Sequence, residues 1–593
     1  MNAPQAIVSH IGYLAGTPAH ALVLAQPGSR LRVAWLAWAL EVAGLESAEK
    51  VPLPLTNPDL APVDHWTIGD LARIDLPTDL EPGWCQVTVE VEGADPVVSQ
   101  PFQIDDSHGY GAVLSDVLYY FKAVRSSGEI ERKDAHALRW NDQSGLVVDG
   151  RGGWLDASGD TSKHLSHLTF TSMMMPQQIP LCSWAMLAAR DVLAASGNEI
   201  VSFLDDRLRD EGLFGADFLV RFQAPEGYFY VGLFDGMTKE MDQRFVCSGL
   251  PGYVRTDRYQ AAYSHGGGMA IATLARAAMA GDHGDFDSAK YLSAAEAGFA
   301  DLEAHNLDYR LDHTESIIDD YCALLGASEL VITTCQTPDA KPAPYLAAAI
   351  RRANSLIGRY HKGADGKPGY LVGDSTGRPF FHAVESGLPV LALLRFAEAV
   401  RLANADEQAL AAQAEATALQ IMTDWLGRTD GVPNPCGYPR ALVQPTDCEP
   451  REQFFFPHAN ETGYWWQGEN ANLASIAAAA LTTAKLPQCD DATAARLRQL
   501  ADDALTWIVG CNPFDVCMIN GRGRGNVEYQ EIWPSVPGGI SNGITAGHDD
   551  EHDIEFMPIP PVDIEEAWRW GEQWIPHAGW FLLAGSLLIA DIA

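Results

Sequence analysis

The stretch Asp105-Asp106-Ser107-His108-Gly109 divides the sequence into two parts with different patterns of apolar residues. Before it, from Ala6 to about Ile104, short apolar runs are separated by Gly, Pro and Asp turns, which is typical of β-strands. After it, apolar residues recur at i, i+3 and i+4, which is typical of amphipathic helices. The sequence therefore predicts a small β-sandwich over residues 1–106 and a mainly helical domain over residues 107–593.

The helical part contains about a dozen segments of this kind, the first near Leu114 to Ser126 and the last from Trp570 to Ile592. A closed ring of paired helices suits this pattern, because the inner helices can bury apolar faces against one another while loops at one end carry the chemistry. We therefore expect the functional residues in the loops.

Charge excludes two classes of partner. The chain has 593 residues, with 40 Lys and Arg against 78 Asp and Glu, and a formal net charge of -38. Nucleic acid and anionic membranes repel such a surface, so we expect neither as a partner. Residues 1–28 contain no Lys or Arg and no sustained apolar run, which predicts a cytoplasmic protein.

No cofactor is expected from the sequence. The ten cysteines form no CxxC pair, which favours buried thiols over disulfides or zinc. The Gly-rich stretch Gly521-Arg522-Gly523-Arg524-Gly525 is too short for a dinucleotide site. The acidic run from His548 to Asp553 offers oxygen ligands for Ca²⁺, but it lacks the regular alternation of a calcium loop. A solvated loop, or a patch facing substrate, is favoured there.

One loop combines two carboxylates with an aromatic ring. In Arg151-Gly152-Gly153-Trp154-Leu155-Asp156-Ala157-Ser158-Gly159-Asp160, two aspartates follow Trp154 within a turn-forming stretch. This combination suits sugar hydrolysis, because an ionised carboxylate activates water and a ring stacks on the apolar face of a pyranose. The structural alternative is that Asp156 or Asp160 caps the helix that follows.

A further carboxylate, Glu572, lies among Trp568, Trp570 and Trp574 at the start of an apolar helix. A partly desolvated glutamate has a raised pKa and can hold the proton that a general acid donates. The alternative is a first-turn glutamate that complements the helix dipole.

A third cluster, from Phe454 to Asn470, mixes aromatic and polar residues, among them Trp465, Trp466 and Glu469. This density on a loop before a helix indicates sugar subsites. Alternatively, Glu469 and Asn470 simply start the helix.

Together these loops resemble glycoside hydrolase family 9, the inverting cellulase family with an (α/α)6 barrel often preceded by an immunoglobulin-like domain. The resemblance spans nearly the whole chain. It rests on Ile11-Gly12-Tyr13-Leu14, on Gly153 to Asp160 as the GGWxDAGD signature, on His382 to Pro389, on Trp507 to Pro513, and on Gly571-Glu572 before a helix.

The resemblance implies roles for three carboxylates. In that family the second Asp of the signature is the general base and the first helps to hold the attacking water, which implies these roles for Asp160 and Asp156. Ser158 adds one residue between them. Glu572 occupies the position of the family's catalytic acid.

One departure concerns sugar recognition. Family cellulases usually follow the Gly-x-Asn-Pro segment with a His-His-Arg motif, whereas this chain has Gly523-Arg524-Gly525-Asn526-Val527-Glu528-Tyr529-Gln530. With Asp160 to His167, Pro176-Gln177-Gln178 and Trp465 to Asn470, the chain looks like the subgroup of exo-β-glucosaminidases that act on chitosan-derived oligosaccharides.

The leading hypothesis is therefore an inverting, exo-acting β-glycosidase that removes glucosamine from short β-1,4-linked oligosaccharides. The loops from Phe454 to Asn470 and from His548 to Asp553 are expected to wall off one end of the site. The residues expected to contact the sugar are Trp154, Trp465, Trp466, Glu469, Glu528, Tyr529, Asp549 and Asp550.

Two other functions remain as alternatives. One is a β-1,4-glucanase or cellodextrinase. The other, from a different class, is a non-catalytic carbohydrate-binding protein, against which the retained carboxylates at Asp156, Asp160 and Glu572 argue.

Overall fold

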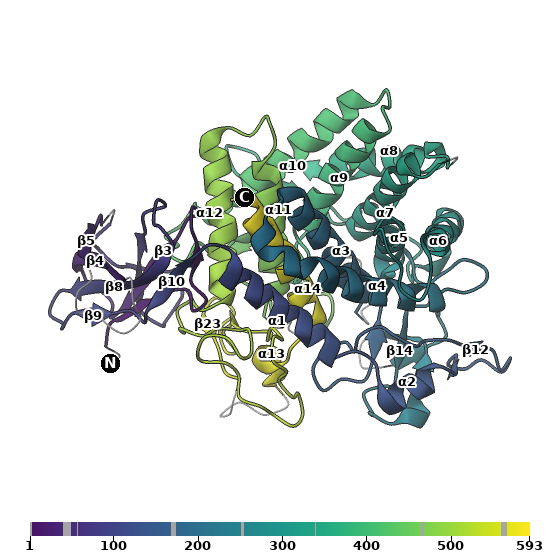
Figure 1. Cartoon of the computed structure of the whole chain (residues 1–593), viewed down its shortest axis with the longest axis horizontal. Coiled ribbons are helices and arrows are strands. Elements are labelled where there is room, and N and C mark those ends of the chain that lie inside the picture. The colour runs from purple at the N-terminus through teal and green to yellow at the C-terminus, as the bar shows by residue number, and fades with distance from the viewer. Residues whose placement is uncertain are drawn as a thin grey trace.

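The computed structural model describes residues 3–39, 49–55, 57–167, 174–250, 254–338, 340–463, 468–558 and 566–592. The N-terminal strands form a separate body beside a large helical one (Figure 1). The last strand of the first body ends at Asp105, and the first helix begins at His108.

Two facing sheets make up the N-terminal body. One has the strand order β1-β3-β7-β6, and the other β2-β10-β8-β4-β5, with β9 paired to β8. Along β8, Cys85, Val87 and Val89 are fully buried and alternate with more exposed neighbours, so one face of the strand packs into the core between the sheets. The strands are β1 (Gln5–Ile7), β2 (Tyr13–Leu14), β3 (His20–Ala25), β4 (Leu31–Ala39), β5 (Glu49–Leu53), β6 (Ala61–Pro62), β7 (Asp70–Asp75), β8 (Gly83–Val91), β9 (Val97–Val98) and β10 (Phe102–Asp105).

Twelve long helices of the described chain form two concentric rings. The inner ring closes in the order α3, α5, α7, α9, α11 and α14, and each inner helix packs against an outer one. The inner helices are α3 (Ile179–Ser196), α5 (Gly267–Ala277), α7 (Ile317–Gln336), α9 (Leu388–Leu402), α11 (Asn470–Ala484) and α14 (Ile575–Asp591). The outer helices are α1 (His108–Ala123), α4 (Asp205–Arg221), α6 (Ser288–Tyr309), α8 (Ala343–Gly358), α10 (Gln408–Thr429) and α12 (Asp491–Ile508). The predicted fold class, an (α/α)6 barrel preceded by an all-β sandwich, is confirmed.

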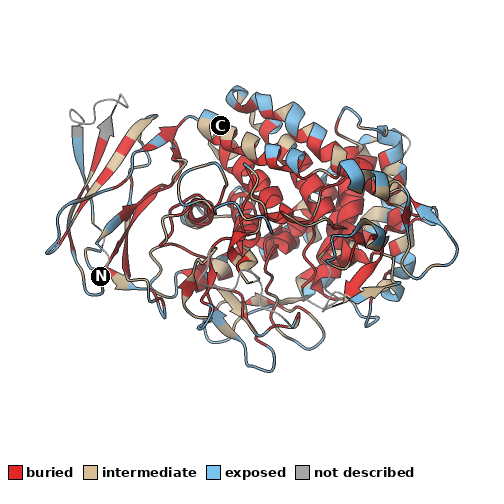
Figure 2. Ribbon diagram, turned by 90° about the horizontal axis from the view of Figure 1, so that it is seen from below, coloured by how far each residue is buried: buried red, intermediate tan, exposed pale blue. Residues whose placement is uncertain are grey.

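Burial distinguishes the two rings (Figure 2). The inner helix α14 is buried from Ile575 to Ile589, whereas the outer helix α6 buries only one face. Small residues let the inner helices approach closely. A Cβ at Gly268 of α5 would lie 2.7 Å from the backbone carbon of Cys322 in α7, so only glycine fits there.

Short elements decorate the loops of the barrel. They are the helices α2 (Gly128–Asp134) and α13 (Trp568–Gly571) and the strands β11 (Ala137–Leu138), β12 (Val147–Val148), β13 (Lys163–His164), β14 (Gly232–Phe234), β15 (Phe245–Val246), β16 (Ser248–Leu250), β17 (Val254–Thr256), β18 (Tyr360–His361), β19 (Tyr370–Leu371), β20 (Ala441–Val443), β21 (Arg451–Gln453), β22 (Thr545–Ala546) and β23 (Ile554–Glu555). Single 3-10 turns lie at Glu199–Leu204, Met241–Gln243 and Tyr263–His265.

The C-terminal helix starts later than the sequence predicts. The apolar pattern predicts a helix from Trp570, but α13 ends at Gly571 and α14 begins at Ile575. Glu572 and Trp574 between them have extended backbone conformations. Pro576 fits the first turn of α14, where a missing N–H costs nothing. This break separates Glu572 from the helix.

Two further findings concern the sequence-based expectations. All ten cysteines are free thiols, and most of them are buried, as expected. Among the described residues there is no helix with both the length and the apolar character needed to span a membrane.

The inner ring makes a testable contribution to stability. Trp580 is fully buried in α14, so we expect Trp580→Ala to lower the free energy of unfolding by about 3–5 kcal/mol through the cavity it leaves. Tyr119 on α1 is 57% exposed, and Tyr119→Ala should change stability by less than about 0.5 kcal/mol. Urea unfolding followed by circular dichroism measures both, and equal losses would contradict the assignment of α14 to the core.

Candidate active site

Two loop segments far apart in the sequence pair like short β-strands. The N–H of Ser158 donates to the carbonyl of Gln573 at 2.8 Å, and the N–H of Gln573 donates back to Ser158 Oγ at 3.0 Å. The N–H of Ile575 donates to the carbonyl of Asp156 at 3.3 Å. The pairing fixes Asp156 and Asp160 beside Glu572. Ser158, the residue by which this loop departs from the family signature, contributes two of these bonds.

Asp160 is more exposed than Asp156, the other aspartate of the loop. It is half-buried, and its Oδ1 accepts the N–H of Thr161 at 2.6 Å and that of Ser162 at 3.1 Å. Burial raises its pKa, while these two backbone N–H groups favour the ionised form. Thr161 Oγ1 donates to Asp235 Oδ2 at 2.6 Å, which ties the loop to the end of β14. A carboxylate held this way can accept a proton from water.

Asp156 lies deeper, with 7% of its surface exposed. The indole Nε1 of Trp574 donates to its Oδ1 at 3.0 Å, and the amide of Gln178 donates to the same oxygen. Burial raises the pKa of Asp156, and the charge of Asp160 raises it further. Asp156 is therefore an oriented group beside the more accessible Asp160.

Glu572 has the surroundings of a proton donor. Burial raises its pKa well above the usual range, and the charges of Asp156 and Asp160 add to the effect. A carboxyl group that keeps its proton at neutral pH can act as a general acid. The side chain itself is half-buried, which leaves it accessible.

A chain of hydrogen bonds orients Glu572. The N–H of Ala471, in the first turn of α11, donates to His577 Nδ1 at 2.8 Å, so the proton of this imidazole is on Nε2. Burial lowers the pKa of His577 to about 3, which keeps the ring neutral. Its Nε2 lies 2.8 Å from Asn542 Oδ1 and donates to it. The amide nitrogen of Asn542 then faces Glu572 Oε2 at 3.5 Å.

The segment from Val527 to Pro534 lies beside both candidate catalytic residues, Asp160 and Glu572. A Cβ at Gly159 would lie 2.4 Å from the carbonyl oxygen of Ile532, and a Cβ at Gly571 would lie 3.3 Å from a methyl group of Val527. Gly159 also has a φ of 81°, which favours glycine. The segment therefore passes close to the residues that precede Asp160 and Glu572.

Two of the predicted sugar contacts, Glu528 and Tyr529, lie on this segment, and Asp549 and Asp550 lie on the acidic loop. Glu528, Tyr529, Asp549 and Asp550 are exposed, and Tyr529 has 66% of its surface exposed. Sequence reasoning missed Glu531, which is also exposed on the same segment. Its only signal in the sequence is the spacing of three residues from Glu528 in an acidic, aromatic loop.

The expected sugar contact of Trp154 is corrected by its position. Its indole is fully buried, where it packs between Phe121 and Phe214 and donates Nε1–H to Glu211 at 2.8 Å. No ring face is left for a sugar. Trp154 instead anchors the start of the catalytic loop in the core.

The aromatic loop from Phe454 to Asn470 is only partly described. Trp465 and Trp466 lie outside the described residues. Glu469 is 7% exposed, accepts the N–H of Phe456, and has a pKa raised by burial to about 8. It precedes α11 directly, so the structure supports the helix-start alternative for this residue.

The two loops expected to form a wall are joined to each other. Glu551 of the acidic loop accepts the N–H of His458 at 2.6 Å and pairs with Arg451. Asp553 accepts Thr67 Oγ1 from the sandwich at 2.6 Å. At the other end of the aromatic loop, Gly468 donates to the carbonyl of Arg569 at 3.3 Å, three residues before Glu572. The loops thus form one connected rim.

Comparison with known proteins agrees with this fold. The sequence model of glycosyl hydrolase family 9 matches residues 110–531. No curated protein matches the chain. Solved structures share the fold, and three examples follow. A metagenome-derived family 9 endoglucanase has 18% identity, 99% coverage of both chains and a TM-score of 0.62. A mutant thermostable endoglucanase from Alicyclobacillus acidocaldarius has 15% identity, 99% coverage of both chains and a TM-score of 0.62. The family 9 endoglucanase J30 has 18% identity, coverage of 97% of this chain and 99% of its own, and a TM-score of 0.62.

Removal of either proton-transfer group should abolish most glycoside hydrolysis. We expect Asp160→Asn and Glu572→Gln each to lower kcat by about 10²–10⁴-fold, because each removes one proton transfer with little change in volume. Asp156→Asn should be impaired less. Glu398→Gln, at an exposed position on α9, is the matched control and should keep full activity. More than half the activity in either main variant would overturn the assignment.

The hydrogen bond from Asn542 should be visible in the pH dependence. This bond lowers the pKa of Glu572, so in Asn542→Ala the pKa of Glu572 rises and the alkaline limb of the pH–rate profile moves to higher pH. Asn512→Ala is the control, because Asn512 is also fully buried and donates to two backbone carbonyls. Both changes should lower the melting temperature. A limb that moves in neither variant would contradict the orienting role of Asn542.

Proposed function

Because the chain belongs to glycosyl hydrolase family 9, and is therefore a glycoside hydrolase, we propose that it is an inverting, exo-acting β-glycosidase of short β-1,4-linked oligosaccharides. The observation that carries this proposal is the pairing of the Asp156–Asp160 loop with the Glu572–Trp574 segment, which places the three carboxyl groups together. Burial and the neighbouring carboxylates raise the pKa values of Asp156 and Glu572, which supports a division of roles.

In this proposal Glu572 donates its proton to the glycosidic oxygen as the bond to the departing sugar breaks. Asp160 accepts a proton from a water molecule that attacks the anomeric carbon from the opposite face. Asp156 orients that water or Asp160, since its own oxygen is engaged by Trp574 and Gln178. The attack from the opposite face inverts the configuration of the released sugar.

The joined rim supports exo action. The acidic loop bonds to the aromatic loop through Glu551 and to the sandwich through Asp553, and the aromatic loop returns to the segment that carries Glu572. In this proposal the rim, tied at three points, closes one end of the site. A substrate chain would then enter from the other end only, and single sugars would be released from its terminus.

Terminal glucosamine is the proposed sugar. Glu528 and Glu531 are exposed on the segment that touches both catalytic loops, and Tyr529 offers an exposed ring between them. A sugar ammonium pairs with carboxylates by charge-assisted hydrogen bonds, whereas a glucose hydroxyl gains less from them. Asp549 and Asp550 lie on the rim as further candidates.

A second candidate is a β-1,4-glucanase that cuts within the chain. Solved structures with this fold are described as endoglucanases, although they share only 15–18% identity with this chain. Cleavage within the substrate chain requires a groove that remains open beyond the rim.

Product analysis separates the two candidates. We expect chitosan oligosaccharides to be shortened one glucosamine at a time, and cellodextrins of equal length to be cut at least about tenfold more slowly in kcat/KM, because an ammonium gains more than a hydroxyl from the carboxylates. Chromatography of the early products measures chain length. Release of mixed internal fragments, or a fast fall in polymer viscosity, would contradict exo action.

The same assay tests the glucosamine site. Glu528→Gln and Glu531→Gln should lower kcat/KM for the amino sugar while leaving the rate on cellodextrins unchanged. Glu398→Gln again serves as the control on a distant surface. A preference for cellodextrins in the unmodified protein would favour the glucanase.

A further inference from the structure

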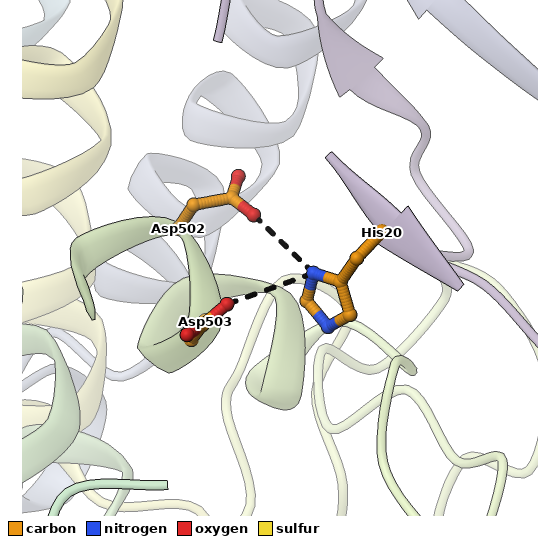
Figure 3. Close-up of side chains that lie close together, drawn as sticks. All are labelled: His20, Asp502 and Asp503. Carbon is orange, nitrogen blue, oxygen red and sulfur yellow. Dashed lines mark ion pairs between the residues drawn. The ribbon is translucent and has the colours of Figure 1, made fainter. Parts of the chain in front are cut away.

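Away from the catalytic loops, three titratable side chains meet where the sandwich adjoins the barrel. His20 is the first residue of β3, and Asp502 and Asp503 lie in α12 (Figure 3). His20 Nδ1 is 3.7 Å from Asp502 Oδ2 and 3.6 Å from Asp503 Oδ1. The three side chains are buried, with no more than 2% of any residue exposed. They point toward one common space.

The surrounding contacts satisfy only part of this cluster. Asp503 Oδ1 accepts Arg73 Nη1 at 2.8 Å and Gln499 Nε2 at 2.9 Å. In contrast, His20 Nδ1 and Asp502 Oδ2 are both buried without a hydrogen-bond partner. On the other side of the imidazole, Nε2 faces Cys511 Sγ at 3.4 Å. Buried polar atoms are normally hydrogen-bonded, so two unsatisfied atoms that face each other at 3.7 Å mark this cluster as a candidate ligand site.

We propose that His20, Asp502 and Asp503 bind a divalent first-row metal ion, for which Zn²⁺ has the best-matched chemistry. One imidazole nitrogen and two carboxylate oxygens are ligands that Zn²⁺ accepts in a tetrahedral arrangement. Bonds of about 2.0–2.2 Å place tetrahedral ligands roughly 3.3 Å apart, so small side-chain movements suffice. Three protein ligands are too few for Ca²⁺, which takes about 6–8 oxygens.

An ion bound between the three side chains would be coordinated by one imidazole nitrogen and two carboxylate oxygens. It would give His20 Nδ1 and Asp502 Oδ2, the two buried atoms without a hydrogen bond, a common partner.

The position of the cluster indicates a structural role for the ion. One ligand comes from the sandwich and two come from the barrel, so the ion would cross-link the two bodies. An ion that binds only the folded, docked arrangement stabilises it by mass action. None of the three ligands contacts the catalytic carboxylates among the interactions of the described residues, so the expected effect is on stability.

The test uses the full chain, treated with a chelator, dialysed and titrated with ZnCl2 in isothermal titration calorimetry under reducing conditions. We expect one tight site per chain and a higher melting temperature, both lost in His20→Gln and in Asp502→Asn. Asp515→Asn is the matched control, because Asp515 also meets a sandwich histidine, His10, at 3.0 Å but pairs with Arg524 in place of a second acid. This variant should bind Zn²⁺ like the unmodified protein.

Two results would overturn the proposal. One is the absence of a tight site in the unmodified protein. The other is equal Zn²⁺ binding by the unmodified protein and both ligand variants, as the ten free thiols would give. Should the variants fail to fold, Co²⁺ absorption of the unmodified protein decides the question. Visible bands of a tetrahedral nitrogen and oxygen site are expected, and a near-ultraviolet thiolate band would contradict it.

Discussion

The active site depends on one constraint: a β-like pairing between the Asp156–Asp160 loop and the Glu572–Trp574 segment. Three carboxyl groups that would repel one another when ionised are held side by side by backbone hydrogen bonds, which cannot relax without breaking the pairing. Because the groups cannot move apart, burial and repulsion favour their protonated forms and raise the pKa values of Asp156, Asp160 and Glu572. In the proposed mechanism, the acid and base roles follow from the differences in hydrogen bonding among the three groups.

The barrel supplies the support for this pairing at the starts of three inner helices. Gln178, directly before α3, binds Asp156, and the first turn of α11 fixes the tautomer of His577 in α14. Each helix start leaves N–H groups without helical partners, and the site uses those of Ala471 in α11 and Ile575 in α14. The helices themselves are held by close contacts between small residues. The placement of the carboxyl groups is thus a consequence of packing between the inner helices of the barrel.

Much of this arrangement could be predicted from the sequence, because local sequence patterns indicate the two bodies and the carboxylate loops. The change of periodicity after Ile104 gives both bodies, and the carboxylates appear in loops rich in Gly and Trp. Trp154 shows the limit, since a ring beside carboxylates has the same local pattern whether it faces a sugar or the core. Asn542 and His577 were missed because their roles come only from contacts between distant segments. Glu531 was missed because its spacing from Glu528 is a weak local signal. The helix pattern also continued through Glu572, where pairing with Ala157 and Ser158 overrides it.

The central claim is that Asp160 and Glu572 act on opposite faces of the sugar, with one water molecule between Asp160 and the anomeric carbon. An inverting pair leaves about 6.5–9.5 Å between its carboxyl groups, whereas a retaining pair is about 5–5.5 Å apart. Proton NMR of the first-formed product reads the outcome directly, before mutarotation. The account predicts that the α-anomer appears first from a β-linked oligosaccharide. Initial release of the β-anomer would show that one carboxylate attacks the sugar itself, and would contradict the roles assigned here.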